Sequence, residues 1–136
     1  CIRDRILVCT HGRFGEELIR STEMIGGKLK NITAVSLLED MSMDDYYVAV
    51  KEELDERSVY LCLTDLFGGT PCNTLLNLSR DYNIEILCGV NLPMLLEASS
   101  SCGFGTVEDL KKHLMEVYAM NGFDVLEKMK GNTYGN

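Results

Sequence analysis

The sequence has few basic residues, no long apolar run and no closely spaced cysteine pair. Its 13 Lys and Arg residues are outnumbered by 21 Asp and Glu residues, which gives a formal net charge of -8. A chain this acidic, without a basic stripe, is not expected to bind nucleic acid or an anionic membrane. No stretch approaches the roughly 18 apolar residues needed to span a bilayer, and residues 1–5 do not begin a signal-peptide core.

Six cysteines are present, but none forms a C-x-x-C pair. A zinc site is therefore not expected, and the sequence shows no other metal-ligand cluster. Cys9, Cys62 and Cys88 each lie inside an apolar run typical of a buried strand. We interpret them as free, buried thiols, which favours a reducing, cytoplasmic environment.

What the chain does have is a regular alternation of strand and helix patterns over 136 residues, of which 46% are hydrophobic. Continuous apolar runs predict buried strands at 6–9, 32–38, 59–64 and 84–90. The segments between them have helical spacing. The sequence therefore predicts a single α/β domain over residues 1–136: a doubly wound, mostly parallel sheet of order 2-1-3-4 with helices on both faces.

Capping residues mark where several of these helices begin. Ser42, three residues before Asp45, predicts a capping box, and Thr106 predicts an N-cap in the same way. Thr70 is predicted to be an N-cap because Pro71 follows it, and proline is favoured at the first helical position.

Two polar side chains end neighbouring strands of this predicted sheet. His11 follows the first strand, and Asp65 follows the third. The carboxyl ends of adjacent parallel strands meet at one crevice, so we expect His11 and Asp65 to lie together there. A carboxylate beside an imidazole fixes the ring tautomer and stabilises the imidazolium form. Asp65 would bind one ring N–H and leave the other nitrogen free to attack phosphorus.

The segments around this pair could bind a phosphoryl group. Gly68 and Gly69 permit close backbone approach, and their amides and the Thr70 hydroxyl could bind phosphate oxygens. The helix that opens after Gly12 offers N-terminal amides to the same group. Phe67 is a candidate docking side chain. His113, the other histidine, is interpreted as a solvated surface residue. No cofactor is expected.

Three blocks of sequence carry a resemblance to a known family. They are Thr10-His11-Gly12, the stretch from Thr64 to Asn73, and the stretch from Gly89 to Glu97. In order and spacing they resemble the EIIA domain of the mannose/fructose/sorbose family of bacterial sugar phosphotransferase systems (PTS), over nearly the whole chain. The resemblance implies that His11 accepts a phosphoryl group from the phosphocarrier HPr and passes it to EIIB, with Asp65 orienting the imidazole. It also implies a cytoplasmic protein associated indirectly with the membrane components EIIC and EIID.

The resemblance further implies a homodimer in which a C-terminal antiparallel strand pairs with the partner's sheet. The segment 123–129, whose pattern is ambiguous between strand and helix, is the place for that strand, and residues 131–136 are expected to be mobile. The chain departs from the family where Arg13 and Phe14 follow the His-Gly pair and where Phe67 replaces a common tryptophan. These three residues are predicted to lie on the docking rim.

Other interpretations stay open at this point. The phosphotransfer domain of dihydroxyacetone kinase systems also uses a histidine after its first strand, although the block from Gly89 to Glu97 favours the sugar family. An EIIA-like regulatory or sensory module is a second alternative. A flavin-binding domain would need a Ser/Thr-rich loop after the first strand, and a response-regulator receiver would need an acidic pair there. The sequence has neither.

Overall fold

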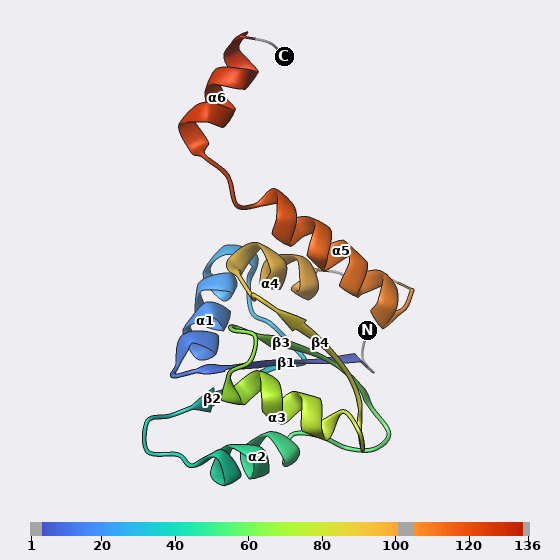
Figure 1. Ribbon diagram of the computed structural model, residues 1–136. Helices are drawn as coiled ribbons and strands as arrows, with labels where there is room; N and C mark the ends of the chain where they lie inside the picture. The colour runs from blue at the N-terminus through green and yellow to red at the C-terminus, as the bar shows by residue number, and fades with distance from the viewer. Residues whose placement is uncertain (1–3, 101–104, 135–136) are drawn as a thin grey trace.

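The protein is described here from a computed structural model, which covers residues 4–100 and 105–134. Its centre is a four-stranded parallel sheet in the order β2-β1-β3-β4, which confirms the predicted topology (Figure 1). The strands are β1 (Asp4–His11), β2 (Ile32–Leu37), β3 (Val59–Thr64) and β4 (Asn83–Cys88). Because β1 and β3 are neighbours, the residues that follow them share one edge of the sheet.

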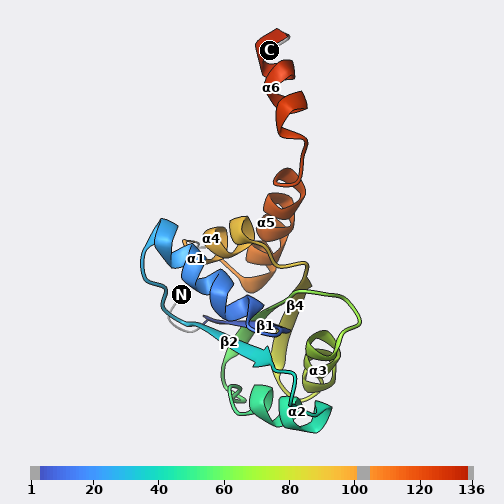
Figure 2. The same cartoon turned by 90° about the vertical axis from the view of Figure 1, so that its left-hand side faces the viewer.

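Helices cover both faces of the sheet. They are α1 (Phe14–Gly26), α2 (Met43–Lys51), α3 (Thr70–Leu78), α4 (Leu92–Ser99), α5 (Val107–Met120) and α6 (Val125–Tyr134). Helices α1, α4 and α5 lie on one face and α2 and α3 on the other (Figures 1 and 2). Alternate residues of β1 enter the two apolar clusters, Ile6 and Val8 on the first face and Leu7 and Cys9 on the second. A strand buried on both faces explains the continuous apolar runs.

The predicted helix starts are confirmed at two of the three positions. The Ser42 side chain accepts a hydrogen bond from the Asp45 backbone N–H, and the Asp45 side chain accepts one from the Ser42 backbone N–H, which completes the capping box. Thr106 is likewise the N-cap of α5. The third prediction was one residue late, because the first turn of α3 closes from the Asn73 N–H to the carbonyl of Gly69. Gly69 is therefore the N-cap, and Thr70 is the first helical residue.

The predicted C-terminal strand is wrong. The chain forms helix α6 from Val125 to Tyr134, which also includes the start of the tail expected to be mobile. The side chain of Asp124 accepts a hydrogen bond from the Glu127 N–H, and its carbonyl accepts one from the Lys128 N–H. This is an N-terminal cap, and good helix formers follow it. In both views α6 stands away from the body of the domain (Figures 1 and 2).

The cysteines within the described ranges are free. Cys9 and Cys62 are fully buried and Cys88 is half-buried, while Cys1 and Cys102 lie outside those ranges. Burial raises the pKa of the Cys9 thiol to about 12, so Cys9 is a packing residue and not a reactive thiol. None of the helices in the described part of the chain has the length and apolar character needed to cross a membrane.

Candidate phosphoryl-transfer site

His11 and Asp65 meet at the carboxyl ends of β1 and β3, as the sequence predicted. The Oδ2 atom of Asp65 lies 3.0 Å from Nδ1 of His11 and also accepts a hydrogen bond of 2.9 Å from the His11 backbone N–H. One carboxylate oxygen thus holds both the backbone and the ring of the same residue. The His11 side chain is 45% exposed and that of Asp65 is 17% exposed. The carboxylate is therefore the sheltered partner and the imidazole the accessible one.

The contact with Asp65 assigns the two ring nitrogens different roles. With Nδ1 donating to the carboxylate, Nε2 carries the lone pair that can attack an electrophile. The ring lies against Gly69: a Cβ added there would come 2.6 Å from Cε1 and 3.1 Å from Nε2 of His11. Only a residue without a side chain leaves this room. Sequence reasoning placed Gly69 in the site, but the packing against the ring depends on the path of the loop.

The contact with Gly69 places the His11 ring at the N-terminus of α3. Gly69 is the N-cap of this helix and Thr70 its first residue, and the first backbone amides of a helix have no partner within the helix. The preceding Gly68 has a φ of +83°, a conformation that glycine adopts without strain, and its carbonyl accepts a hydrogen bond from the Asn73 side chain. The loop is thereby fixed in a shape that presents the helix end to the imidazole.

The turn after β1 is fixed independently. Gly12 has a φ of +56° and donates its N–H to the Leu37 carbonyl of β2. This amide is already bonded, so a phosphate contact to it would have to replace that bond. Thr10, fully buried, accepts a hydrogen bond of 2.8 Å from the Gly15 N–H in the first turn of α1. These bonds hold the start of α1 against the sheet and keep His11 at the edge.

Apolar residues that follow His11 and Asp65 in the chain are exposed. Phe67 is 78% exposed, and Phe14 and Leu66 are about half exposed. Sequence analysis singled out Phe14 and Phe67 but missed Leu66, which is apolar like a core residue and was therefore not flagged as a surface one. Arg13 is the N-cap residue of α1 and is also exposed. Exposed aromatic side chains of this size are typical of protein interfaces.

The second histidine lies on a different element from this pair. His113 lies on α5, with its Nε2 atom 3.6 Å from a carboxylate oxygen of Glu97 on α4. Within residues 4–100 and 105–134, no group of three or more His, Cys, Asp or Glu side chains is placed to hold a metal ion. The contact between Nδ1 of His11 and Oδ2 of Asp65 supports nucleophilic attack by an oriented imidazole.

The packing of Gly69 against the His11 ring predicts different effects for alanine substitutions at Gly69 and at the neighbouring Gly68. We expect Gly69→Ala to fold normally, because its φ of -79° suits alanine, yet to slow phosphorylation of His11 by about tenfold or more by displacing the ring. Gly68→Ala should instead destabilise the fold and change the transfer rate little. Its added Cβ meets open space, but the alanine must adopt a φ of +83°. Thermal unfolding and transfer rates of both variants test this. Equal rates in Gly69→Ala and the parent would contradict it.

Comparison with known proteins identifies the family. The family described as "PTS system fructose IIA component" matches residues 5–115. The chain is 33% identical over 134 residues to the PTS system fructose-specific EIIA component of Bacillus subtilis (strain 168), covering 92% of this chain and 90% of that one. It is 31% identical over 96 residues to the mannose-specific EIIAB component of Escherichia coli (strain K12), covering 68% of this chain and 30% of that longer protein.

A solved structure supports the same assignment. The phosphotransferase system component EIIA from Streptococcus agalactiae has a TM-score of 0.84 and 33% identity, covering 91% of this chain and 98% of that one. The dihydroxyacetone kinase alternative is not favoured by these matches. The predicted resemblance is confirmed: the chain belongs to the IIA family of mannose- and fructose-type sugar phosphotransferase systems, whose members are phosphoryl carriers.

Proposed function

We propose that Nε2 of His11 is the atom that carries the phosphoryl group, received from HPr and delivered to EIIB. The observation that carries this proposal is the 3.0 Å contact between Nδ1 of His11 and Oδ2 of Asp65. It uses one ring nitrogen and leaves the other exposed beside the N-terminus of α3. The family match supports the proposal, because a phosphoryl carrier of this kind would hold the group on one of its own side chains.

In the proposed step, the Nε2 lone pair forms a bond to phosphorus as the bond between phosphorus and the donor's histidine nitrogen breaks. The electron pair of that broken bond returns to the donor's ring. The Nδ1 proton of His11 stays on the ring and donates to Asp65, whose charge stabilises the positive ring that results. Amides at the start of α3 and the Thr70 hydroxyl bind the phosphoryl oxygens. Delivery to EIIB is the same step in reverse.

The direct experiment is phosphorylation followed by site mapping. We expect incubation with phosphoenolpyruvate, enzyme I and HPr to place one phosphoryl group on the chain, at His11, through an acid-labile phosphoramidate bond. Mass spectrometry at neutral and alkaline pH locates it, and brief acid treatment should remove it. Label that survives acid, or label on His113, would contradict the assignment.

Transfer from phosphorylated HPr is expected to need no metal ion. The donor is already activated, and the site stabilises charge with amides and a carboxylate, so positioning supplies the catalysis. We expect the transfer rate to be unchanged in excess EDTA when phosphorylated HPr is prepared beforehand and freed of Mg²⁺. Loss of this single step on chelation, restored by Mg²⁺, would overturn the prediction.

We also propose that the chain forms a homodimer through its C-terminal segment. The apolar side chains Phe123, Val125, Leu126 and Met129 are all more than half exposed, and α6 stands away from its own domain. The edge of β4 has no neighbouring strand among the described residues. In a dimer with two-fold symmetry, α6 of each copy would bury its apolar side chains against the uncovered β4 edge of the other copy.

This proposal predicts a mass of about twice 15.2 kDa in solution. Truncation before Phe123, or Leu126→Glu alone, should give monomers or aggregates. Met24→Glu is the matched control, because Met24 is also an exposed apolar residue but lies on α1. Sedimentation at micromolar concentration measures each variant. A full-length chain that sediments as a monomer would refute the dimer.

A further inference from the structure

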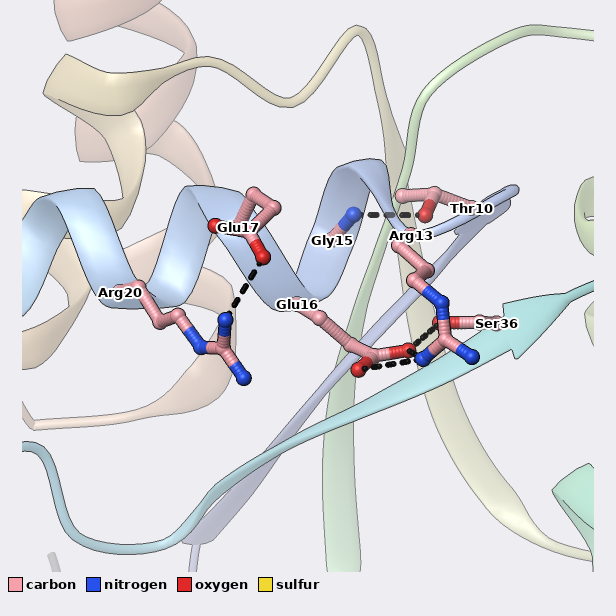
Figure 3. Close-up of polar contacts among 7 residues, drawn as sticks. All are labelled: Thr10, Arg13, Gly15, Glu16, Glu17, Arg20 and Ser36. Carbon is pink, nitrogen blue, oxygen red and sulfur yellow. Dashed lines mark hydrogen bonds and ion pairs between the residues drawn. The ribbon is translucent and has the colours of Figure 1, made fainter.

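A chain of three polar side chains links the start of α1 to β2 at the edge that carries His11. The Nη1 atom of Arg13 lies 3.3 and 3.4 Å from the two carboxylate oxygens of Glu16, and the Ser36 hydroxyl donates to the same carboxylate (Figure 3). The hydrogen bond from Ser36 is the largest of the effects that lower the pKa of Glu16, followed by those of Arg13. Glu16 is therefore charged, and it is tethered to a strand twenty residues away.

A second pair on the same helix shows what this tether adds. Glu17 and Arg20 also form an i,i+3 ion pair, at 2.8 Å, but both side chains are at least 60% exposed and the pair stays within α1 (Figure 3). Exposed pairs of this kind contribute little to stability. In the pair of Arg13 and Glu16, the hydrogen bond from Ser36 fixes the Glu16 carboxylate. The Arg13 side chain is therefore held in one orientation and loses little further conformational entropy when it binds a ligand.

Arg13 lies in one of the loops at the edge of the sheet that carries His11. Four loops follow the four strands at the edge that carries His11, and all of them lie in the described residues. Arg13 is the only Lys or Arg in them; the loop after β2 instead carries Glu39 and Asp40. The Arg13 side chain is 65% exposed, and its described contacts involve only Nη1. Phe14, the next residue in the chain, is exposed as well.

We propose that Glu16 and Ser36 are positioning residues that hold Arg13 ready for a carboxylate on the protein that docks over His11. A guanidinium fork held from one side binds a second carboxylate with its free donors. The other charged residues of this edge are acidic, so Arg13 alone adds little to the long-range electrostatic attraction of a partner. As one fixed cation, it sets the orientation in which the partner binds. This inference rests on the proposed function, because a partner protein must cover the rim to reach Nε2.

The test measures KM and kcat for transfer from phosphorylated HPr, and separately for transfer to EIIB. We expect Arg13→Ala to raise KM in at least one of the two reactions by about three- to fivefold, with kcat within about twofold of the parent. Ser36→Ala changes no charge, yet should raise the same KM by about twofold. Glu17→Ala is the matched control and should not raise KM.

Glu16→Ala tests whether Glu16 positions Arg13 or only contributes a charge, because the two roles predict opposite changes in KM. It removes a negative charge, so without a positioning role it would lower KM for a partner that presents a carboxylate. We expect KM to rise instead, and to rise no further when Glu16→Ala is added to Arg13→Ala. Thermal unfolding of each variant shows whether the fold is kept.

Three results would overturn the inference: unchanged KM in both reactions for Arg13→Ala, equal effects of Glu16→Ala and Glu17→Ala, or a Glu16→Ala effect that persists without Arg13. Failure of the proposed function has a different signature, because the parent chain would then take no phosphoryl group at His11. As a readout independent of transfer, titration with unphosphorylated partner should show the same order of affinities among the variants.

Discussion

Replacing His11 by alanine is expected to abolish phosphorylation of this chain while leaving its fold intact. The side chain lies at the surface end of β1 and contributes nothing to either apolar cluster, so its removal should not change the free energy of unfolding by much. It does remove the only nucleophile that Asp65 orients. The measurement is radiolabel transfer from phosphorylated HPr, with circular dichroism to confirm the fold.

The matched control for this variant is His113→Ala. His113 is the other histidine of the sequence and has a carboxylate partner of its own, Glu97, but it lies on α5. We expect this variant to be labelled at the parental rate. Undiminished labelling of His11→Ala, or loss of labelling in His113→Ala, would move the phosphoryl site elsewhere.

The pairing of His11 with Asp65 could be predicted because parallel topology leaves little choice. The apolar runs place both residues directly after buried strands, and the order 2-1-3-4 makes those strands neighbours. Crossover connections are right-handed and short, so few other arrangements of four such strands exist. The result is a contact across 54 residues of sequence that required no side-chain detail to anticipate.

The C-terminal segment could not be predicted in the same way. Its strand was expected from the family resemblance, and the local signal from Asp124, an N-cap followed by helix formers, was overlooked. Helix faces were also harder to place than helix spans. Met43 has the right spacing for the inner face of α2 but is 70% exposed, because Tyr46 and Val50 fill the space against the sheet. The spacing of apolar residues shows which side chains share one face of a helix, but packing against the sheet determines which face is buried.

Contacts that join separate loops were beyond sequence reasoning altogether. Gly69 was predicted to bind phosphate, but its packing against the His11 ring follows from the path of residues 65–69. The tether from Ser36 to Glu16 depends on the register in which Ser36 lies beside Thr10 of β1, which sets how close β2 comes to α1. Neither spacing nor composition specifies such distances.

Asp65→Asn is expected to slow phosphoryl transfer in both directions by roughly 10²–10⁴-fold while the protein still folds. An asparagine can keep its carbonyl oxygen where Oδ2 stands and so preserve both hydrogen bonds to His11. It cannot supply the negative charge that stabilises the ring once phosphorus is bound. Its amide nitrogen would then occupy the place of Oδ1, which is buried and has no hydrogen-bond partner among the described residues. That arrangement costs stability, so a flipped amide that points N–H groups at His11 competes with it.

Either orientation of the asparagine removes part of what Asp65 provides: the first loses charge, the second also loses the acceptor for the Nδ1 proton. Single-turnover transfer from phosphorylated HPr, and back to unphosphorylated HPr, measures both directions. Asp40→Asn is the control, because Asp40 is an exposed carboxylate in the loop after β2 at the same edge, so its loss changes the charge without touching the pair. Parental rates in Asp65→Asn, in both directions, would show that the carboxylate does not act on the phosphorylated ring and that its contact with His11 serves only to hold the end of β1 to β3.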